Sequence, residues 1–413
     1  MSSGGRAKPP LLFLSQTLPF PPDSGAKVRS YHLLSQLSVA YEITALCFYR
    51  RRSTPPADLE EALSRLAPMA KVEAFPIEQE YAVLRHVWDH LRSVISGSVY
   101  TRFAYASIAF QKRLEALLQE TAWACVYADS LDLSRFFPLV TNAPLVCGHH
   151  DAQSVLLSRR AKLEPSAWRR WYVEHQATLM AREEASWCPL VRGNIVVSDL
   201  DKAALQAVAP AGRFTVIPNG VDTRYFTPRD ESSDPLVVFV GAADWFPNLD
   251  GMNYLGEHIL PELRRLYPEV RVRWIGRVSD PVRVRMRERF GIEMTGHLAD
   301  LRDDLGRALC VVVPLRIGSG SRVKILDAWA MGKTVVSTSL GCEGLPARQG
   351  VNILIRDDSE DFARAVDSVL RDTGLRVRIG SAAHATVQHE FDWDTIGAEL
   401  RAGLASFHGG VLQ

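Results

Sequence analysis

The chain has 413 residues, of which 47% are apolar, and this length and composition fit two globular domains of about 200 residues each. Its 48 Lys and Arg residues nearly balance 47 Asp and Glu residues, which argues against a nucleic-acid-binding protein. The sequence holds no run of 18 apolar residues, so we expect no transmembrane helix, and residues 1–10 lack the apolar segment of a secretory signal.

The six cysteines are spread along the chain and show no C-x-x-C or similar metal-site spacing. Cys47, Cys125, Cys147 and Cys310 lie in apolar runs, which is typical of small core side chains. This usage favours a reduced, cytoplasmic compartment and argues against a structural zinc site.

Short apolar segments alternate with amphipathic ones, the pattern of βαβ units, so the predicted fold class is α/β with parallel sheets. In the first half we expect strands at 11–15, 43–48, 71–75, 125–128, 145–147 and 195–198. In the second half we expect them at 236–240, 272–275, 292–295, 310–314, 334–338 and 353–355. The clearest helices are predicted at 248–266, 322–331, 362–370, the segment up to 389, and 396–407.

Proline, glycine and polar residues gather between 209 and 235, as they do in linkers. We therefore place an N-terminal domain at 1–212 and a C-terminal domain at 213–393, followed by a helical segment at 394–413.

Two segments of the first half depart from the simple pattern. An apolar stripe at helical spacing is formed by Leu84, Val87, Trp88, Leu91, Val94 and Ile95. A core-facing helix is the favoured interpretation of this stripe, and a surface that touches a membrane or a lipid-like acceptor is the alternative. The second segment, 159–182, is helical in pattern and mildly basic, with Trp168 and Trp171 interleaved, and predicts a solvated helix pair packed on the sheet.

The most informative motif follows the predicted strand at 310–314. Glycines at 318 and 320 allow a sharp turn and close approach of a ligand, and Ser319 or Ser321 can cap the helix that follows. Arg322 and Lys324 add two cations at a helix start, which favours an anion. Asp327 lies three residues after Lys324 on the same helix face. A diphosphate on the cations and a sugar hydroxyl on Asp327 fit this arrangement, while a capped turn with solvated charges is the simpler alternative.

Other motifs accompany this turn in a fixed order along the chain. They are Ile217–Asp222 (IPNGVD), Val240-Gly241 followed by Trp245, Pro247 and Asn248, Thr295-Gly296, the turn and helix 318–327, Gly332, Val335-Val336, Gly341 and Glu343-Gly344-Leu345. This ordered set resembles the retaining glycosyltransferases of family 4, glycosyl transferases group 1, over nearly all of residues 11–405.

The resemblance implies a GT-B fold, in which two Rossmann-like domains face each other across a cleft. The N-terminal domain would bind the acceptor, the C-terminal domain a nucleotide-diphosphate sugar such as a UDP- or GDP-sugar, and the 394–413 helix would pack back on the first domain. The implied activity is hexosyl transfer with retention, without a metal or other cofactor. The acceptor class stays open between a glycan, a lipid-linked molecule and a small molecule, and a peripheral contact with the inner membrane face is a further expectation.

By position within this family, the resemblance assigns catalytic roles to His150, Arg322 and Lys324. His150 is preferred over His149 because the residues that follow it, Asp151–Ser154, match the pattern after the family's histidine. Donor-binding roles go to Gly25, Gly241, Asn248, Gly296, His297, Leu298, Ile317, Gly318, Ser319, Gly320, Ser321 and Asp327. For Asn248, capping of its helix is an equal alternative.

One residue departs from the family pattern. Asp327 matches the second of two glutamates that hold the donor, but the first falls on Ser319. This departure keeps open a non-catalytic glycosyltransferase-like subunit, and a nucleotide-sugar epimerase or a phosphorylase of similar fold is a further alternative, although the sequence shows no pyridoxal phosphate signature for the phosphorylase.

Overall fold

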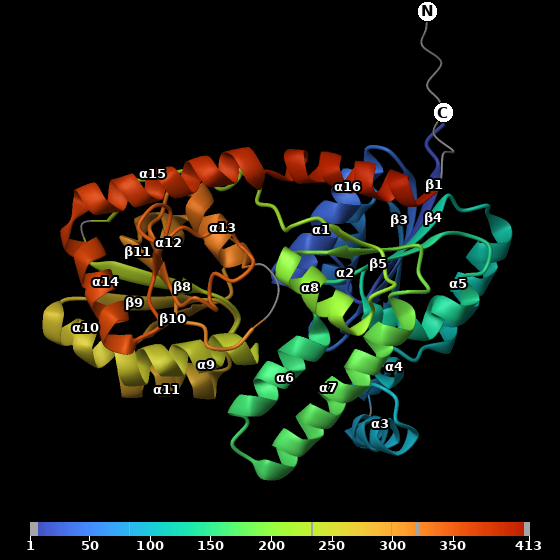
Figure 1. Ribbon diagram of the computed structural model, residues 1–413, viewed down its shortest axis with the longest axis horizontal. Helices are drawn as coiled ribbons and strands as arrows, with labels where there is room; N and C mark the ends of the chain where they lie inside the picture. Colours follow the sequence, from blue (N-terminus) through green and yellow to red (C-terminus); the bar gives the residue numbers. More distant parts are fainter. Residues whose placement is uncertain (1–6, 82, 233, 299, 319–321, 409–413) are drawn as a thin grey trace, which may run out of the picture. The chain divides into compact units, whose positions relative to one another are not determined.

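A computed structural model describes residues 7–81, 83–232, 234–298, 300–318 and 322–408. The chain divides into two compact units, 1–218 with 397–413, and 219–396. Each unit is a parallel α/β sheet covered by helices (Figure 1), as the alternating sequence pattern predicts.

The first unit contains a seven-stranded parallel sheet, in the order β3-β2-β1-β4-β5-β6-β7. Its strands are β1 (Pro10–Ser15), β2 (Glu42–Tyr49), β3 (Lys71–Pro76), β4 (Cys125–Ala128), β5 (Leu145–Gly148), β6 (Gly193–Val196) and β7 (Phe214–Val216). Its helices are α1 (Gly25–Ser38), α2 (Pro56–Leu66), η1 (Glu78–Tyr81), α3 (Val83–Ser96), α4 (Thr101–Ala104), α5 (Ile108–Glu120), η2 (Leu131–Leu139), α6 (Gln153–Leu163), α7 (Ala167–Trp187) and α8 (Asp199–Val208).

The second unit contains a six-stranded parallel sheet, in the order β10-β9-β8-β11-β12-β13. Its strands are β8 (Leu236–Val240), β9 (Arg271–Ile275), β10 (Glu293–Gly296), β11 (Cys310–Val313), β12 (Val335–Ser337) and β13 (Leu354–Ile355). Its helices are α9 (Phe246–Tyr254), the π-helical η3 (Leu255–Ile259), α10 (Leu260–Leu266), α11 (Asp280–Phe290), α12 (Arg302–Arg307), α13 (Val323–Ala330), α14 (Ser359–Arg371) and α15 (Thr373–Glu390), and α16 (Trp393–His408) continues into the first unit.

The two sheets share the order of their first six strands. We call the place where the strand order reverses direction the turning point of each sheet. In each, the first strand lies at the centre, and the fourth strand pairs on its other side: β1 with β4, and β8 with β11. The strand order reverses between these two strands, and open α/β sheets bind ligands at the carboxyl ends of the strands at such a turning point. The fold therefore provides one ligand-binding position in each unit.

The structure divides the chain after Pro218, six residues beyond the predicted domain boundary at 212. The segment 214–216, which we expected in the linker, forms β7 and pairs with β6 through Asn194 and Phe214. The chain leaves the first sheet only after Pro218. From α16, Arg401 donates a 2.7 Å hydrogen bond to Gln36 of α1, and this contact lies within the first unit.

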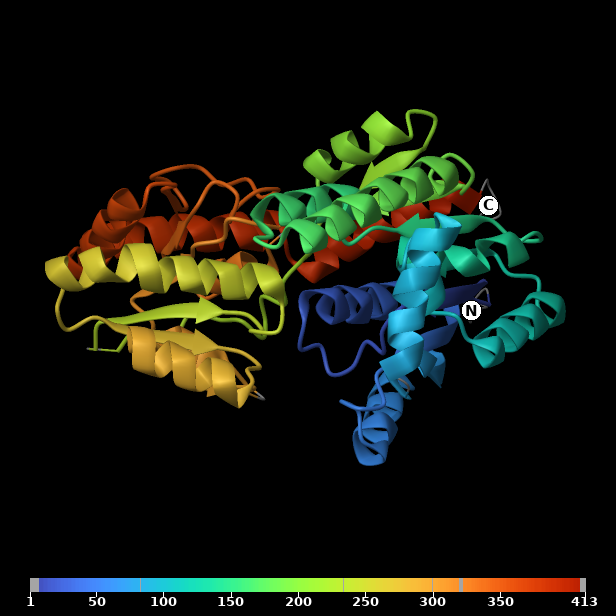
Figure 2. The ribbon, with the colours of Figure 1, turned by 90° about the horizontal axis from the view of Figure 1, so that it is seen from below.

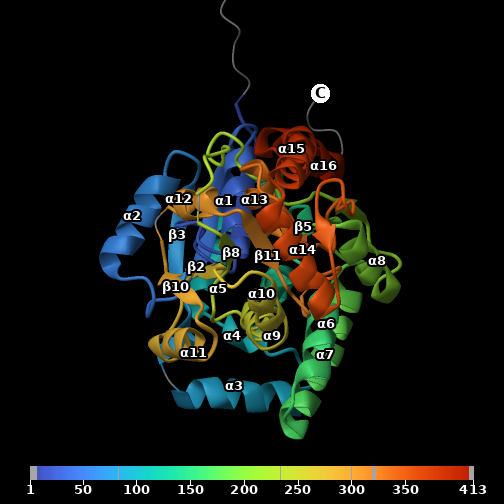
Figure 3. The same cartoon turned by 90° about the vertical axis from the view of Figure 1, so that its left-hand side faces the viewer.

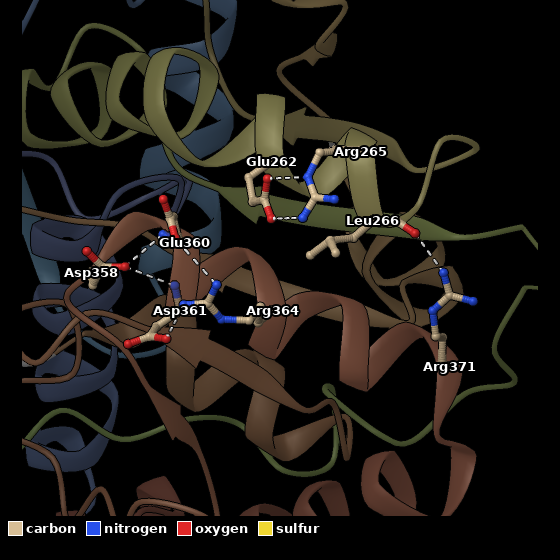
Figure 4. Close-up of polar contacts among 8 residues, drawn as sticks. All are labelled: Glu262, Arg265, Leu266, Asp358, Glu360, Asp361, Arg364 and Arg371. Atoms are coloured by element: carbon tan, nitrogen blue, oxygen red, sulfur yellow. Dashed lines mark hydrogen bonds and ion pairs between the residues drawn. The ribbon is translucent and has the colours of Figure 1, made fainter.

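The outer helices of the second unit are joined by charged side chains (Figure 4). Arg371 of α14 donates a 2.7 Å hydrogen bond to the carbonyl of Leu266 at the end of α10. Asp358 caps α14 by accepting from the backbone N–H groups of Glu360 and Asp361, at 2.9 and 3.0 Å. These contacts hold α14 against α10 and cap its first turn, and so stabilise the fold.

All six cysteines are buried with free thiols, which confirms the core role expected for four of them. No helix in the described part of the chain has the length and hydropathy needed to cross a bilayer. Within the same residues there is no group of three or more His, Cys, Asp or Glu side chains that could hold a metal ion.

Candidate active site

The second unit places glycines at the carboxyl ends of four neighbouring strands. Gly296 ends β10, Gly276 and Gly241 follow β9 and β8, and Gly318 follows β11. All four have positive φ, between 80° and 154°. A Cβ atom on Gly276 would lie 2.2 Å from the Gly241 carbonyl oxygen, so only glycine fits there. Gly276 was not among the predicted site residues.

Lys324 lies in the first turn of α13, beside Gly241. Its ammonium group donates a 2.6 Å hydrogen bond to Asn248 Oδ1 and lies 4.2 Å from the centre of the Phe239 ring. Burial, and then the neighbouring charge of Arg322, hold the pKa of Lys324 well below its usual value. Because the amide of Asn248 is neutral, an arriving anion would supply the charge that this site lacks.

Asn248 does not cap its helix, so the capping alternative is wrong. It is the third residue of α9, whose N-cap position is Trp245. The side-chain amide donates to the Ala242 carbonyl at 2.8 Å and accepts from Lys324. Asn248 thus connects the glycine loop after β8 to the cation of α13.

Arg322 occupies the N-cap position of α13, where we expected a serine. Its guanidinium is buried and donates to the Leu340 carbonyl at 3.3 Å. A Cβ on Gly318 would lie 2.4 Å from Arg322 Nη2, so this glycine makes room for the arginine. Arg322 and Lys324 therefore meet at the turning point of the second sheet, although they are only two residues apart.

The remaining predicted donor-binding residues differ in their exposure to solvent. Ile317 is buried, His297 is exposed, and Leu298 packs against the core of the second unit. Ser319, Gly320 and Ser321 lie outside the described residues.

Asp327 is one turn further along α13, and burial raises the pKa of its carboxyl to about 8. The folded chain keeps this proton up to about pH 8, whereas the unfolded chain loses it near its ordinary pKa of 3.8. The stability of the wild type should therefore fall as the pH rises through this interval. We expect Asp327→Asn to remove this loss of stability. The melting temperature of the variant should therefore rise relative to that of the wild type between about pH 5 and about pH 8. Melting curves that stay parallel over this range would contradict the assignment.

The first unit gathers polar side chains at its own turning point. Asp129 directly follows β4, is buried, and accepts from Ser15 at the end of β1 at 3.2 Å and from Ser30 of α1. Nε2 of His150, which follows β5, lies 3.6 Å from the same carboxylate oxygen and makes no hydrogen bond among the described residues. A partly exposed imidazole is thus held beside a buried carboxylate, an arrangement suited to hydrogen bonding with a substrate.

The neighbouring histidine has a different environment. His149 is buried, and its Nε2 lies 3.0 Å from Asn194 Oδ1 of β6. Burial lowers the pKa of His149 to about 4, so this ring stays neutral at physiological pH. These contacts give His149 a structural position in the sheet.

Two further residues of the first unit lie in α1. Arg29 is buried and donates to the carbonyls of Ile217 and Pro218 at 3.0 and 3.2 Å. It therefore anchors the start of the IPNGVD segment. Gly25 begins α1, and a Cβ there would meet no atom within 4 Å, so its open surroundings can admit a ligand.

A cavity of about 660 Å³ lies beside the edge of the first sheet, at the carboxyl ends of β2 and β3. Its lining combines cations and aromatic hydroxyls and consists of Arg50, Arg52, Ile77, Gln79, Glu80, His86, Tyr100, Thr101, Ala104 and Tyr105. Arg50 pairs with Glu80 at 2.8 Å, and the Tyr100 hydroxyl donates to Gln79 at 2.9 Å. This mixture of groups fits a hydroxyl-rich ligand better than an apolar one.

Comparisons with known proteins agree with the fold. Residues 234–372 match the sequence model of the family described as glycosyl transferases group 1, and this segment contains Gly241, Lys324 and Asp327. The chain is 38% identical over 74 residues to the lipopolysaccharide core biosynthesis glycosyltransferase LpsE of Rhizobium meliloti (strain 1021), a match that covers 17% of this chain and 22% of LpsE. It is 24% identical over 165 residues to an uncharacterized 44.6 kDa protein in the cps region of Klebsiella pneumoniae, covering 38% of this chain and 42% of that protein.

Solved structures resemble nearly the whole chain. Anabaena Alr3699/HepE in complex with UDP and glucose superposes with a TM-score of 0.68 at 18% identity, over 96% of this chain and 100% of the other. TarM gives a TM-score of 0.68 at 10% identity, over 97% and 99% of the two chains. WaaG, a glycosyltransferase involved in lipopolysaccharide biosynthesis, gives 0.63 at 14% identity, over 97% and 100%. The protein therefore has the GT-B fold expected from its sequence, whereas its matches to the two curated relatives span only about a fifth and two fifths of their lengths.

Proposed function

We propose that this protein is a glycosyltransferase that moves a sugar, with retention of anomeric configuration, from a nucleotide-diphosphate sugar to an acceptor hydroxyl. The observation that carries the proposal is the pair of cations at Arg322 and Lys324, held at the turning point of a Rossmann-like sheet whose strand ends carry glycines. The family match at 234–372 and the fold shared with HepE, whose structure contains UDP and glucose, support it.

In this proposal the donor diphosphate lies against the glycine loop after β8 and the start of α13. Arg322 and Lys324 stabilise the negative charge that develops on the leaving nucleotide diphosphate. Asn248 holds the Lys324 ammonium in place through its 2.6 Å hydrogen bond. Asp327 binds the ribose hydroxyls, and the acidic form that burial favours can donate as well as accept. With cations in these positions, the transfer would not need a metal ion.

His150 in the first unit would hydrogen-bond to the reacting sugar or acceptor, with Asp129 as the carboxylate that positions it. We propose a front-face substitution, in which the acceptor oxygen bonds to the anomeric carbon as the bond to the diphosphate breaks. The acceptor proton then passes to the departing phosphate oxygen. The acceptor belongs to polysaccharide, glycolipid or glycoside biosynthesis, and the cavity lined by Arg50 and Tyr100 is the candidate position for its hydroxyl groups.

Nucleotide binding tests this proposal first. In calorimetric and thermal-shift titrations with UDP, GDP, ADP and dTDP, we expect one diphosphate to bind saturably, equally well with and without magnesium. Binding should be lost in Lys324→Ala, because the substitution removes a half-buried cation from the phosphate position. Absence of binding by all four nucleotides would instead favour the non-catalytic glycosyltransferase-like subunit.

A further inference from the structure

Helix α3 turns its apolar side to solvent, so the core-facing interpretation of its apolar stripe is wrong. Leu84, Val87, Trp88, Leu91 and Ile95 have exposed fractions from 47% for Leu91 to 85% for Leu84. Asp89 and Ser93, on the opposite side, are 2% and 0% exposed. This arrangement is the reverse of an ordinary surface helix.

Polar contacts on the buried side hold α3 in this orientation. Ser93 Oγ accepts a 2.8 Å hydrogen bond from Gln176 of α7 and donates to the Ser98 carbonyl at 2.7 Å. His90 Nδ1 lies 2.5 Å from the hydroxyl of Tyr172, also on α7. Arg85 pairs with Glu78 at 2.9 Å. Full burial of a large apolar side chain stabilises a protein by roughly 1.5–3 kcal/mol, and these five side chains lack that stabilisation while they face water. An apolar environment outside the chain is therefore expected to cover them.

The tip of the α6–α7 helix pair carries exposed tryptophans and cations. The two helices run side by side (Figure 2), and their tip lies on the same side of the first unit as α3 (Figure 1, Figure 3). Trp168 is 68% and Trp171 55% exposed, and Trp171 directly precedes the Tyr172 that contacts α3. Lys162, Arg169 and Arg170 are exposed at the same tip, together with the acidic Glu174. We call Leu84, Val87, Trp88, Leu91, Ile95, Trp168 and Trp171 the α3–α7 face.

We propose that the α3–α7 face docks on the surface of a bilayer that contains anionic lipids. Aliphatic side chains on one side of an amphipathic helix enter the boundary between headgroups and acyl chains, and tryptophans favour that same depth. The basic residues at the α6–α7 tip attract anionic headgroups.

The charges beside the face favour an anionic membrane over a second copy of the chain. Lys162, Arg169 and Arg170 are exposed at the α6–α7 tip, with Glu174 as the exposed acid. A two-fold interface would bring these like charges of two copies together, whereas anionic headgroups complement them. Membrane docking would bring the first unit, with its candidate acceptor cavity, to lipid-linked acceptors. The inference extends the proposed function but is tested separately from it.

Flotation of the full chain with vesicles tests the proposal. We expect the wild type to float with vesicles of equal parts phosphatidylcholine and phosphatidylglycerol, and to bind vesicles of phosphatidylcholine alone more weakly. The double variant Leu91→Ser/Ile95→Ser should lower the partition coefficient about tenfold or more, because both side chains leave the apolar face. Replacing Arg169 and Arg170 by Gln should weaken binding to the anionic vesicles by about fivefold per charge removed.

The matched control is Val39→Ser/Leu200→Ser, which removes two exposed apolar side chains of the same unit outside the face and should float like the wild type. Absence of flotation, or equal flotation of the Leu91/Ile95 variant and the wild type, would overturn the proposal. A concentration-dependent dimer that only the Leu91/Ile95 variant abolishes would assign the face to a second copy instead. UDP titration of the same variants keeps the tests apart, because these substitutions should leave nucleotide binding unchanged.

Discussion

Lys324→Ala is expected to slow sugar transfer by about 10²–10³-fold, the typical cost of removing one preorganised group that stabilises transition-state charge. The reason lies in the position of the ammonium group, which is half-buried beside Gly241 and hydrogen-bonded to the neutral amide of Asn248. The charged group that shifts its pKa is another cation, Arg322, rather than a carboxylate. Arg322→Ala should have an effect of the same order. Steady-state transfer with the nucleotide sugar identified by titration measures both.

A control variant and a stability check distinguish the loss of a cation from the loss of the folded structure. Arg287→Ala removes an exposed cation from α11 of the same unit and should leave turnover unchanged. Each variant is checked by thermal unfolding before its kinetics are interpreted. Near-normal transfer rates in both Lys324→Ala and Arg322→Ala would contradict the proposed diphosphate site, because transfer would then not depend on either cation.

His150→Ala is expected to lower the rate of transfer by about 10²–10⁴-fold while leaving nucleotide affinity close to that of the wild type. The imidazole belongs to the first unit, whereas Arg322, Lys324 and Asp327, proposed to bind the diphosphate and the ribose, belong to the second. Transfer assays and nucleotide titration on the same preparation measure the two effects independently.

His149→Ala is the informative comparison. This ring is buried against Asn194, so its removal should destabilise the protein by about 1–3 kcal/mol and affect transfer less than His150→Ala does. If His149→Ala abolished transfer in a well-folded protein while His150→Ala remained active, the roles assigned to the two histidines would be reversed.

Much of the fold follows from local sequence patterns. The strands β4 and β8 begin and end where their β-branched and apolar runs predict, because strands buried on both faces need continuous apolar sequence. Gly318 could also be singled out, since a backbone position with positive φ favours glycine and so leaves a mark in the sequence. β7 was missed because its three residues lie among prolines and glycines and only pairing with β6 defines it.

The contacts within the site depend on residues far apart in the chain. Asp129 follows a predicted strand but was not among the predicted site residues. Its role emerges because parallel pairing brings Ser15, Ser30 and His150 to the same carboxylate. Asn248 likewise resembled a helix cap, and only the approach of α9 to α13 gives it Lys324 as a partner.

Helix α3 shows the same division most clearly. The periodicity of its apolar residues is a local property and correctly indicated an amphipathic helix. Which side faces the protein is decided by distant partners, here Tyr172 and Gln176 on α7, whose polar groups bind His90 and Ser93. Local spacing sets the conformation of a segment, whereas the direction its side chains face depends on surfaces that exist only after the chain has folded.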